Sequence, residues 1–600
     1  MSSDVNLPPL KIASLPGVKR DGTRFEGDYH VDALWARWQR GLPRKIGGFR
    51  SINRYMQGIV RTMHGYTRDT LTYVHAASAN LIERFTVTGA GVCSVITDRT
   101  PSTLTDSDLN MWQFDNVADS SNGTNLLVAQ VAPNLECICN SYGGQFFTGD
   151  LLGTSALVEV TGMALPSNFS ATGGVVVLHP YTFVFGNDGY VAWSVPGDPT
   201  DFTGSGAGNA YVAGQKIVRG LPLRGGPGNS PSGLLWSADE LIRVSYIGGT
   251  PVFQFDTIAG QMSILGPQTV IEYDGIFYWI GTDRFLLFNG VVREIPNNLN
   301  LNWFFDNLNA SQRQKVFAYK VPRYGEIWWC FPYGTATECT HAVIYNVREN
   351  TWYDTELPNG GRAGGLSPSI FRKPMLSGVE PQDFIATDAV IDNAGSGYAV
   401  GDVLEVVGGL GSIPVELTVS GVTLGAIDTV SISNAGRYEV VPDNPASVTA
   451  KTGTGVDATF TLTFVAPYNL WIHESGLNQI DGQNEQPVRS YYETADLMLP
   501  LLDASLPDRW LNISALEADF VQSGDLTVTI TGRANARAPE VESDAMVIPE
   551  VATTSSEQIV HFKTQRRQLR FRFESNTING DYQAGQILAH FQAGDGTITS

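Results

Sequence analysis

The chain has 600 residues, of which 42% are hydrophobic and only 16% charged, with 63 Gly and 31 Pro. This composition suits short strands joined by turns and excludes a protein built mainly of long surface helices, which need Lys and Glu. A length of 600 residues exceeds what one hydrophobic core supports, so three or more structural units are expected.

The net charge of −21 is unevenly distributed along the chain. Residues 1–70 contain twelve Lys or Arg against six Asp or Glu, a net of +6, so the rest of the chain carries −27. A body this acidic repels nucleic acid. The basic N-terminal segment could contact phosphate, bind an acidic protein partner, or be a solvated surface without a role.

Residues 1–55 are predicted to be irregular and to form a basic arm or platform segment, with one amphipathic stretch from Asp32 to Arg40. The segment 44–50 places cations on both sides of two glycines and Phe49. Basic side chains beside an acidic body favour head-to-tail contacts around a ring. The candidate contacts to neighbouring subunits or to an adaptor protein are Arg37, Arg44, Lys45, Arg50 and Arg54.

A hairpin-like unit recurs six times between residues 70 and 355, which places a propeller-like domain at residues 56–375. Its first strands centre near Tyr73, Leu127, Val184, Leu235, Tyr278 and Trp328, with spacings of 54, 57, 51, 43 and 50 residues. The second strands are predicted at residues 81–85, 135–139, 190–193, 241–244, 285–288 and 343–345. Several strands per unit at such a spacing are the sequence signature of a propeller, and a row of unrelated sandwiches is the alternative.

The sixth unit is rich in aromatic residues, and the four that we single out are Trp328, Trp329, Trp352 and Tyr353. They could form a carbohydrate platform. Filling the wedge between blades is the favoured interpretation, because alternation along a strand sends Trp328 and Trp329 to opposite sides.

The composition changes abruptly in residues 383–465, where acids far outnumber the two bases, Arg437 and Lys451. The phrase Asn-Ala-Gly occurs twice there, at residues 393–395 and 434–436, each time between β-branched runs. We therefore expect a two-lobed, acidic inserted β-domain at residues 376–467. Residues 468–600 show alternating strands and are predicted to form a C-terminal β-sandwich or platform domain, with Arg570 and Arg572 on the open face of one strand.

The expected fold class is therefore all-β: an irregular six-bladed β-propeller-like body with a β-sandwich platform and an inserted small β-domain. No run of apolar residues approaches the length of a membrane helix, and no signal pattern opens the chain, so a soluble protein made in a cytosol is expected. The five cysteines are an odd number and thinly spread, which favours a reducing compartment.

The sequence gives no sign of catalytic chemistry. There is no CxxC pattern for zinc, and Cys137 and Cys139 are better explained as small buried hydrophobes. Nucleophile-elbow and phosphate-loop patterns are absent. His473-Glu474 could be an acid/base pair but is more typical of a structural contact, and spacing alone does not exclude paired carboxylates for glycoside hydrolysis. No catalytic residue, cofactor or metal ligand is predicted, and the chain is expected not to be an enzyme.

Several phrases also resemble one protein family. They are Phe317-Ala318-Tyr319, the run 323–329 (Arg-Tyr-Gly-Glu-Ile-Trp-Trp), residues 343–346, the run 349–353 (Glu-Asn-Thr-Trp-Tyr), residues 234–237 with Val244, Gly266-Pro267 with residues 273–279, residues 44–49, residues 473–476 and residues 566–568. Together they resemble the phage stabilisation or tail nozzle proteins of short-tailed bacteriophages, over roughly residues 40–375 and 468–595.

The resemblance implies a virion protein of the phage tail, assembled in the host cytoplasm as a homohexameric ring below the portal and adaptor. Such a ring would close the tail, contact the head-to-tail connector and tail fibre or tail needle proteins, and conduct double-stranded DNA during ejection without sequence-specific binding. The acidic block resembles an insert carried by assorted phage structural proteins. The alternative is a receptor-binding or polysaccharide-degrading tail protein, which predicts three-fold symmetry and a cleft with paired carboxylates and aromatic floors.

Overall fold

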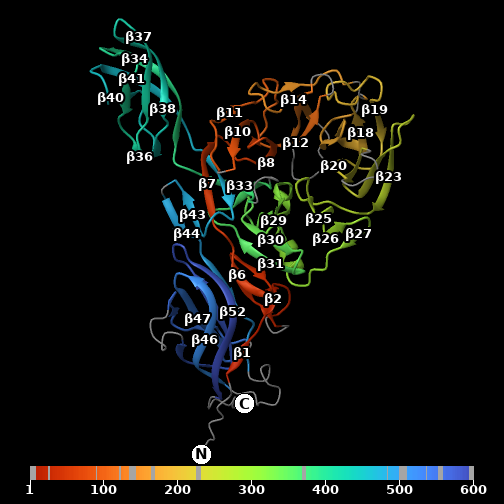
Figure 1. The fold of residues 1–600 in the computed structure, drawn as a ribbon, viewed down its shortest axis with the longest axis vertical. Coiled ribbons are helices and arrows are strands. Elements are labelled where there is room, and N and C mark those ends of the chain that lie inside the picture. The colour runs from red at the N-terminus through yellow and green to blue at the C-terminus, as the bar shows by residue number, and fades with distance from the viewer. Residues whose placement is uncertain are drawn as a thin grey trace, which may run out of the picture. The chain divides into compact units, whose positions relative to one another are not determined.

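The protein is all-β, and its computed structural model (Figure 1) describes residues 9–23, 28–89, 91–119, 123–133, 143–163, 166, 169–223, 231–367, 373–482, 484–498, 510–535, 537–551 and 559–593. Within these ranges the α-helix α1 (Leu301–Asn307) has seven residues, and the 3₁₀ turns η1 (Asn187–Gly189) and η3 (Ala310–Lys315) are shorter still. No helix in the described ranges is long and apolar enough to cross a membrane. The chain divides into two compact units, residues 1–53, 61–377 and 471–600 in unit 1 and residues 54–60 and 378–470 in unit 2.

Six four-stranded antiparallel sheets of unit 1 are the blades of a β-propeller, and Figure 1 shows them around a common centre. Blades 1 and 2 consist of β8 (Thr62–Arg68), β9 (Leu71–Ala77), β10 (Ile82–Thr88) and β11 (Thr97–Asp98), then β12 (Asn110–Ala118), β13 (Asn125–Pro133), β14 (Gln145–Asp150) and β15 (Val158–Glu159). Blades 3 and 4 consist of β16 (Gly174–Leu178), β17 (Tyr181–Phe185), β18 (Tyr190–Trp193) and β19 (Gly208–Tyr211), then β20 (Ile217–Pro222), β21 (Ser232–Ser237), β22 (Glu240–Tyr246) and β23 (Phe253–Gly260). Blades 5 and 6 consist of β24 (Ile271–Tyr273), β25 (Ile276–Ile280), β26 (Phe285–Phe288) and β27 (Val292–Glu294), then β28 (Phe317–Val321), β29 (Glu326–Phe331), β30 (His341–Asn346) and β31 (Thr351–Glu356).

The first strands of the blades lie nearest the propeller axis, where polar side chains join them. The side-chain amide of Gln113 on β12 donates to the carbonyls of Gly173 (2.6 Å) and Val218 (3.1 Å), at the starts of blades 3 and 4. The amide of Gln268, before β24, donates to Thr62 Oγ1 on β8 at 2.6 Å. Side-chain amides can satisfy buried carbonyls that no neighbouring strand reaches.

Apolar residues fill the spaces between blades because inner strands such as β17 and β29 are buried on both faces, whereas the outer strands β19, β23 and β27 are largely exposed. Trp236 of blade 4 and Trp279 of blade 5 meet with their rings 5.8 Å apart. Turns between these strands use residues that tolerate left-handed backbone: Asp274 (φ 51°) and Gly275 (φ 79°) are the two central residues of the hairpin between β24 and β25. Asp-Gly is a preferred pair for such a turn.

The hairpins predicted from the sequence are the second and third strands of the blades. The predicted return strand of blade 2, residues 135–139, lies outside the described residues. The described strand that pairs with β13 on its far side from β12 is β14, whose register pairs Leu127 with Gly149. Cys137 and Cys139 belong to residues 134–142, outside the described part of the chain.

The N-terminal segment is not irregular, contrary to the prediction for residues 1–55. Its described strands are β1 (Leu10–Ile12), β2 (Leu15–Val18), β3 (Tyr29–His30), β4 (Asp32–Leu34), β5 (Ala36–Gln39), β6 (Leu42–Lys45) and β7 (Phe49–Met56). The stretch from Asp32 to Arg40 is β4 and β5, interrupted at Trp35, whose φ is 52°. Local patterning could not reveal these strands, because β1 pairs with β52 near the C-terminus and β4 pairs with β45.

These N-terminal strands and the C-terminal part of the chain form a β-sandwich. One sheet has the order β5-β6-β52 (Asp581–Ala593)-β46 (Leu511–Ser523)-β50 (Ile559–Arg566), with β1 on β52. The other has the order β4-β45 (Ser490–Glu493)-β51 (Gln568–Ser575)-β47 (Leu526–Arg533)-β48 (Val541–Glu542), with β49 (Met546–Ile548) on β47. Leu516 of the first sheet and Phe571 of the second belong to one buried core, which also contains Trp328 of blade 6. A further sheet has the order β32 (Arg362–Leu366)-β33 (Met375–Pro381)-β42 (Tyr468–His473)-β7-β43 (Asn478–Asp481)-β44 (Asn484–Pro487).

Unit 2 contains the acidic block and has its own core around Leu404, Leu417 and Phe460. Its strands are β34 (Ile385–Ser396), β35 (Val403–Val406), β36 (Leu410–Ile413), β37 (Glu416–Thr423), β38 (Ala426–Asn434), β39 (Arg437–Val440), β40 (Ala446–Ala450) and β41 (Val456–Val465), in sheets of order β34-β41-β40-β35-β37-β38 and β36-β39. The two Asn-Ala-Gly phrases make the same turn, in which Asn393 and Asn434 each accept the backbone N–H of the glycine two residues on. The expected limits of the insertion were 376 and 467, and no sequence pattern indicated that residues 54–60 join it.

Candidate functional site

Residues from some of the phrases that carry the family resemblance lie at one buried place, which we call the ionic junction and define as Arg37, Glu326 and Glu474; Arg37 lies outside those phrases. Arg37 lies on β5, Glu326 opens β29 of blade 6, and Glu474 follows β42. Arg37 Nε is 2.9 Å from Glu326 Oε1, and Arg37 Nη2 donates to Glu474 Oε1. Tyr353 Oη donates to Glu326 Oε1 at 2.6 Å. Three segments far apart in the sequence are thereby joined through charge.

Aromatic rings enclose the ionic junction and exclude water from it. The indole of Trp328 donates to Glu326 Oε2 at 2.9 Å, and its ring centroid lies 5.7 Å from that of Trp35. His473 stacks on Phe49 with centroids 4.8 Å apart. Arg37 is 1% exposed and Glu326 0%, so the ion pairs form in a low-dielectric interior, where unpaired charge is costly.

Burial and pairing set the ionisation of these groups in opposite directions. Burial raises the pKa of Glu326, and Arg37 only partly offsets this. Burial also acts against ionisation of Glu474, but Arg37 and His473 outweigh it, and the pKa of Glu474 is lowered. Burial lowers the pKa of His473 to about 3. A neutral, enclosed histidine is a structural contact, so His473-Glu474 does not offer an accessible acid/base pair.

The structure contradicts two of the five predicted contact cations. Arg37 is enclosed in the ionic junction. Lys45 is 3% exposed, donates from Nζ to the carbonyl of Gly580 at 2.7 Å, and has its pKa lowered to about 8 by burial. Arg50 is exposed, and Arg44 and Arg54 are half-buried. The sequence pattern could not separate these cases, because β5 and β6 become core strands only through their pairing with each other and with β52.

All four singled-out aromatic residues are buried. Trp328 and Trp329 are 0% exposed, Tyr353 is 0% exposed and Trp352 is 2% exposed. Trp328 belongs to the core around the ionic junction, whereas Trp329 packs on Phe285 of blade 5 with centroids 5.3 Å apart. None of them presents a ring to a sugar.

Arg570 is the third cation that burial removes from the surface, although β51 was predicted to present it on an open face. Its guanidinium is 6% exposed and lies within 2.7 Å of Glu493 and 2.8 Å of Glu540. Arg572 has a side chain 21% exposed. The side chains of β51 alternate as predicted, but acidic side chains of neighbouring segments cover the second face.

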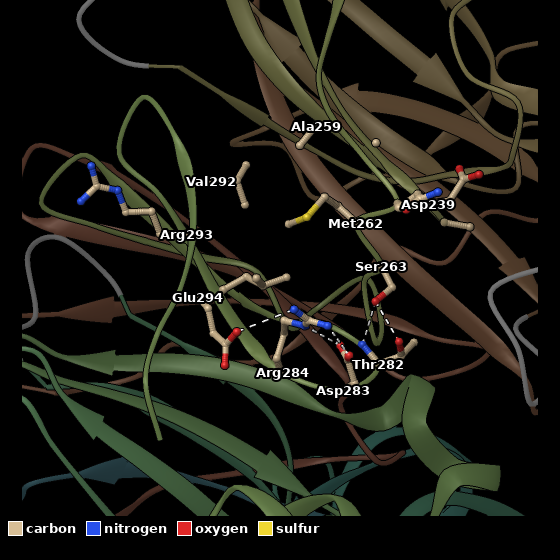
Figure 2. A pocket seen from close by; sticks show the side chains of 14 residues that line it. Asp239, Ala259, Met262, Ser263, Thr282, Asp283, Arg284, Val292, Arg293 and Glu294 are labelled. Atoms are coloured by element: carbon tan, nitrogen blue, oxygen red, sulfur yellow. Dashed lines mark hydrogen bonds and ion pairs between the residues drawn. The ribbon is translucent and has the colours of Figure 1, made fainter. Parts of the chain in front are cut away.

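A groove of about 720 Å³ lies between blades 4 and 5, and several charged side chains line it. Figure 2 shows Asp283 and Glu294 on either side of Arg284. Arg284 donates twice to Asp283, at 2.9 and 2.6 Å, and lies 3.7 Å from Glu294. Ser263 Oγ accepts the N–H of Thr282 at 2.9 Å.

This groove does not have the features that glycoside hydrolysis requires. Its described lining contains no aromatic side chain that could form a sugar platform. The hydrogen bonds from Arg284 lower the pKa of Asp283, whereas a general acid needs a raised pKa. Among the described residues, no group of three or more His, Cys, Asp or Glu side chains could hold a metal ion.

Sequence reasoning missed one surface feature: Arg323 and Arg348 lie with Arg44 next to Tyr324. The guanidinium carbons of Arg44 and Arg323 are 5.8 and 5.2 Å from the centroid of the Tyr324 ring. Arg348 donates to the carbonyls of Pro322 and Arg323, both at 2.8 Å. The phrase Arg-Tyr-Gly was noted for its resemblance, but only folding brings β6 beside it.

No family model matches the chain, and no curated protein matches it. Solved structures similar to parts of it include a nidogen/laminin complex (10% identity, TM-score 0.28, 49% of this chain and 96% of that one) and a protein of Bacteroides uniformis assigned as a 6-phosphogluconolactonase (10%, 0.32, 64% and 96%). An exo-β-1,3-galactanase from Phanerochaete chrysosporium also matches (9%, 0.26, 91% and 100%). At these identities and TM-scores the likenesses carry no inference about function.

Proposed function

We propose that this chain is a structural subunit of the tail of a short-tailed bacteriophage, a nozzle protein that assembles as a ring and conducts DNA during ejection. In that role it is a virion protein made in the host cytoplasm, with no catalytic residues and no cofactor. Its neighbours would be copies of itself, the adaptor or head-to-tail connector, and tail fibre or tail needle proteins.

The observation that supports this proposal is the ionic junction. Among the phrases on which the family resemblance rests, those in residues 44–49, 323–353 and 473–476 contribute residues in or beside it. In the fold Phe49, Glu326 and His473, one from each of these parts, are buried together. The Phe49 and His473 rings stack, and Arg37 pairs with Glu326 and Glu474.

The charge distribution is compatible with a conduit. The acidic surplus of the chain lies outside residues 1–70, so a ring of such chains presents like charge to DNA. The duplex is then repelled from the wall and can slide. A basic lining would release counterions and hold the DNA.

Negative-stain electron microscopy of the purified protein tests the proposal. A six-fold ring with a central hole is the expected result. A three-fold rod, or particles that stay monomeric at every concentration examined, would contradict the nozzle function. The receptor-binding or polysaccharide-degrading alternative gains no support from the groove between blades 4 and 5, for the reasons given above.

A further inference from the structure

Four arginines form a cationic surface on an otherwise acidic protein, and we define this arginine patch as Arg40, Arg44, Arg323 and Arg348. Arg40, Arg323 and Arg348 are exposed, and Arg44 is half-buried. Among the described residues, no carboxylate oxygen lies within 4 Å of a guanidinium nitrogen of these four, whereas Arg20, Arg61, Arg533 and Arg570 are each paired with Asp or Glu.

Arg44, Arg323 and Arg348 are positioned by an aromatic ring and by backbone carbonyls, and these contacts do not neutralise their charge. Tyr324 is 9% exposed. The guanidinium carbon of buried Arg37 lies 3.7 Å from the centroid of its ring, and those of Arg44 and Arg323 lie 5.8 and 5.2 Å from it. Arg348 is fixed by its bonds to two carbonyls of the turn before Gly325. Gly325 (φ +74°) leaves room for it, because a Cβ there would come within 2.6 Å of Arg348 Cγ.

Arg40 joins the patch through the neighbouring turn. Its backbone N–H, and that of Gly41, donate to the carboxylate of Glu349, the residue after Arg348. This contact brings the turn between β5 and β6 beside the turn between β30 and β31.

Few acidic groups face the patch. Glu349 is one, and Asp581, which interacts electrostatically with Arg44, is another. Glu474 interacts electrostatically with Arg323 but is already paired with buried Arg37. Four guanidiniums against two carboxylates, one of which (Asp581) also interacts with Lys45 and Arg37, leave a local excess of positive charge.

We infer that the arginine patch docks an acidic surface of a second copy of this chain. Every other copy supplies such a surface, because the chain is strongly acidic outside residues 1–70. The most acidic part is residues 378–470 of unit 2, with eleven Asp or Glu against Arg437 and Lys451, and Lys451 is already paired with Glu416. Each guanidinium group can pair with one carboxylate through two parallel hydrogen bonds.

A protein partner fits the patch better than DNA does. A duplex carries one charge per about 1.7 Å of its axis, so four guanidiniums would neutralise only a short stretch of it. The carboxylates of Glu349 and Asp581 would also lie against its phosphates. This inference deepens the proposed function, because it names a contact between copies of the chain. It rests on that function only for the shape of the assembly.

The test reverses the charge of two patch residues whose side chains make no hydrogen bond in the described structure, in the double variant R40E/R323E. The matched control is R243E/R537E, which makes the same change in net charge at two exposed arginines outside the patch. Mass photometry and analytical ultracentrifugation measure self-association from low salt to ~0.5 M salt, where exposed charge pairs are screened. Circular dichroism melting checks that each variant is folded.

We expect R40E/R323E to weaken self-association at least tenfold at low salt, with R243E/R537E close to wild type and R40K/R323K in between, because lysine keeps the charge but loses the planar fork. If R40E/R323E does not fold, the neutral single variants R40Q and R323Q replace it, each expected to weaken association severalfold. A wild-type protein that associates but does not form a ring would count against the nozzle function and leave this inference standing.

Four results would overturn the inference. The first is an unchanged association of R40E/R323E, or of both neutral variants. The second is an equal loss in the control. The third is a wild-type protein that is monomeric throughout. The fourth is that R40E/R323E assembles like wild type but loses binding to a 30-base-pair duplex, measured by fluorescence anisotropy. That result would make the patch a phosphate site instead.

Discussion

Replacing Arg37 with methionine should destabilise the core around the ionic junction by about 3–5 kcal/mol, the usual cost of removing one partner from a buried ion pair. Two carboxylates lose their counter-charge: Glu326, which is 0% exposed, and Glu474, which is 11% exposed. Tyr353 and Trp328 still donate to Glu326, but these neutral donors do not balance a buried charge.

The assay is urea unfolding followed by tryptophan fluorescence, because Trp35, Trp38 and Trp328 belong to the same buried core. The control is Arg323→Met, which removes an exposed arginine near the same Tyr324 ring and should cost at most about 1 kcal/mol. The triple variant R37M/E326Q/E474Q removes all three charges and should recover part of the loss, since neutral amides no longer need a counter-charge. If Arg37→Met shifts the unfolding midpoint no more than Arg323→Met does, the ionic junction is not a stabilising network.

The same variant makes a prediction about pH. Without Arg37, burial raises the folded-state pKa of both carboxyl groups above the unfolded value. A raised pKa contributes stability below the unfolded pKa, and that contribution is lost as pH rises through the folded pKa. The deficit of Arg37→Met relative to wild type should therefore shrink as pH falls from 7 towards 4.5. A deficit that grows on acidification would contradict this.

Three further predictions concern the aromatic core, DNA and the insertion. Trp328→Ala and Trp329→Ala should each cost about 3–5 kcal/mol in urea unfolding, without changing affinity for any glycan on an array; lost glycan binding at unchanged stability would favour a receptor-binding protein. The purified protein should bind double-stranded DNA poorly at ~0.15 M salt, with residual binding removed by neutralising Arg44, Arg50 and Arg54; tight, steeply salt-dependent binding that survives this change would argue against a conduit. Replacing residues 383–465 with a short Gly/Ser linker should leave the thermal unfolding of the propeller largely intact, since these strands have their own core, and loss of the folded propeller would show that they complete another core.

The sequence by itself determined the features that depend on neighbours along the chain. The hairpins β9–β10, β17–β18, β21–β22, β25–β26 and β29–β30 were predicted because each pairs two apolar runs across a short polar turn, and their regular recurrence indicated six blades. The position of the acidic insertion followed from composition alone. The aromatic pair Trp328-Trp329 was expected to divide between two cores because side chains alternate along a strand.

Only the tertiary structure decided which charges are buried. Arg37 and Lys45 look like surface cations in a basic segment, yet they are enclosed because β5 and β6 pair with each other and with β52, near the opposite end of the chain. The pairing of β13 with β14 was not predicted, because an apolar run by itself does not reveal its partner. The arginine patch needs β6 beside the turn that precedes β29, and no pattern within either segment encodes that proximity. Local periodicity follows from backbone geometry, whereas strand pairing and the burial of charge depend on which distant segments share a core.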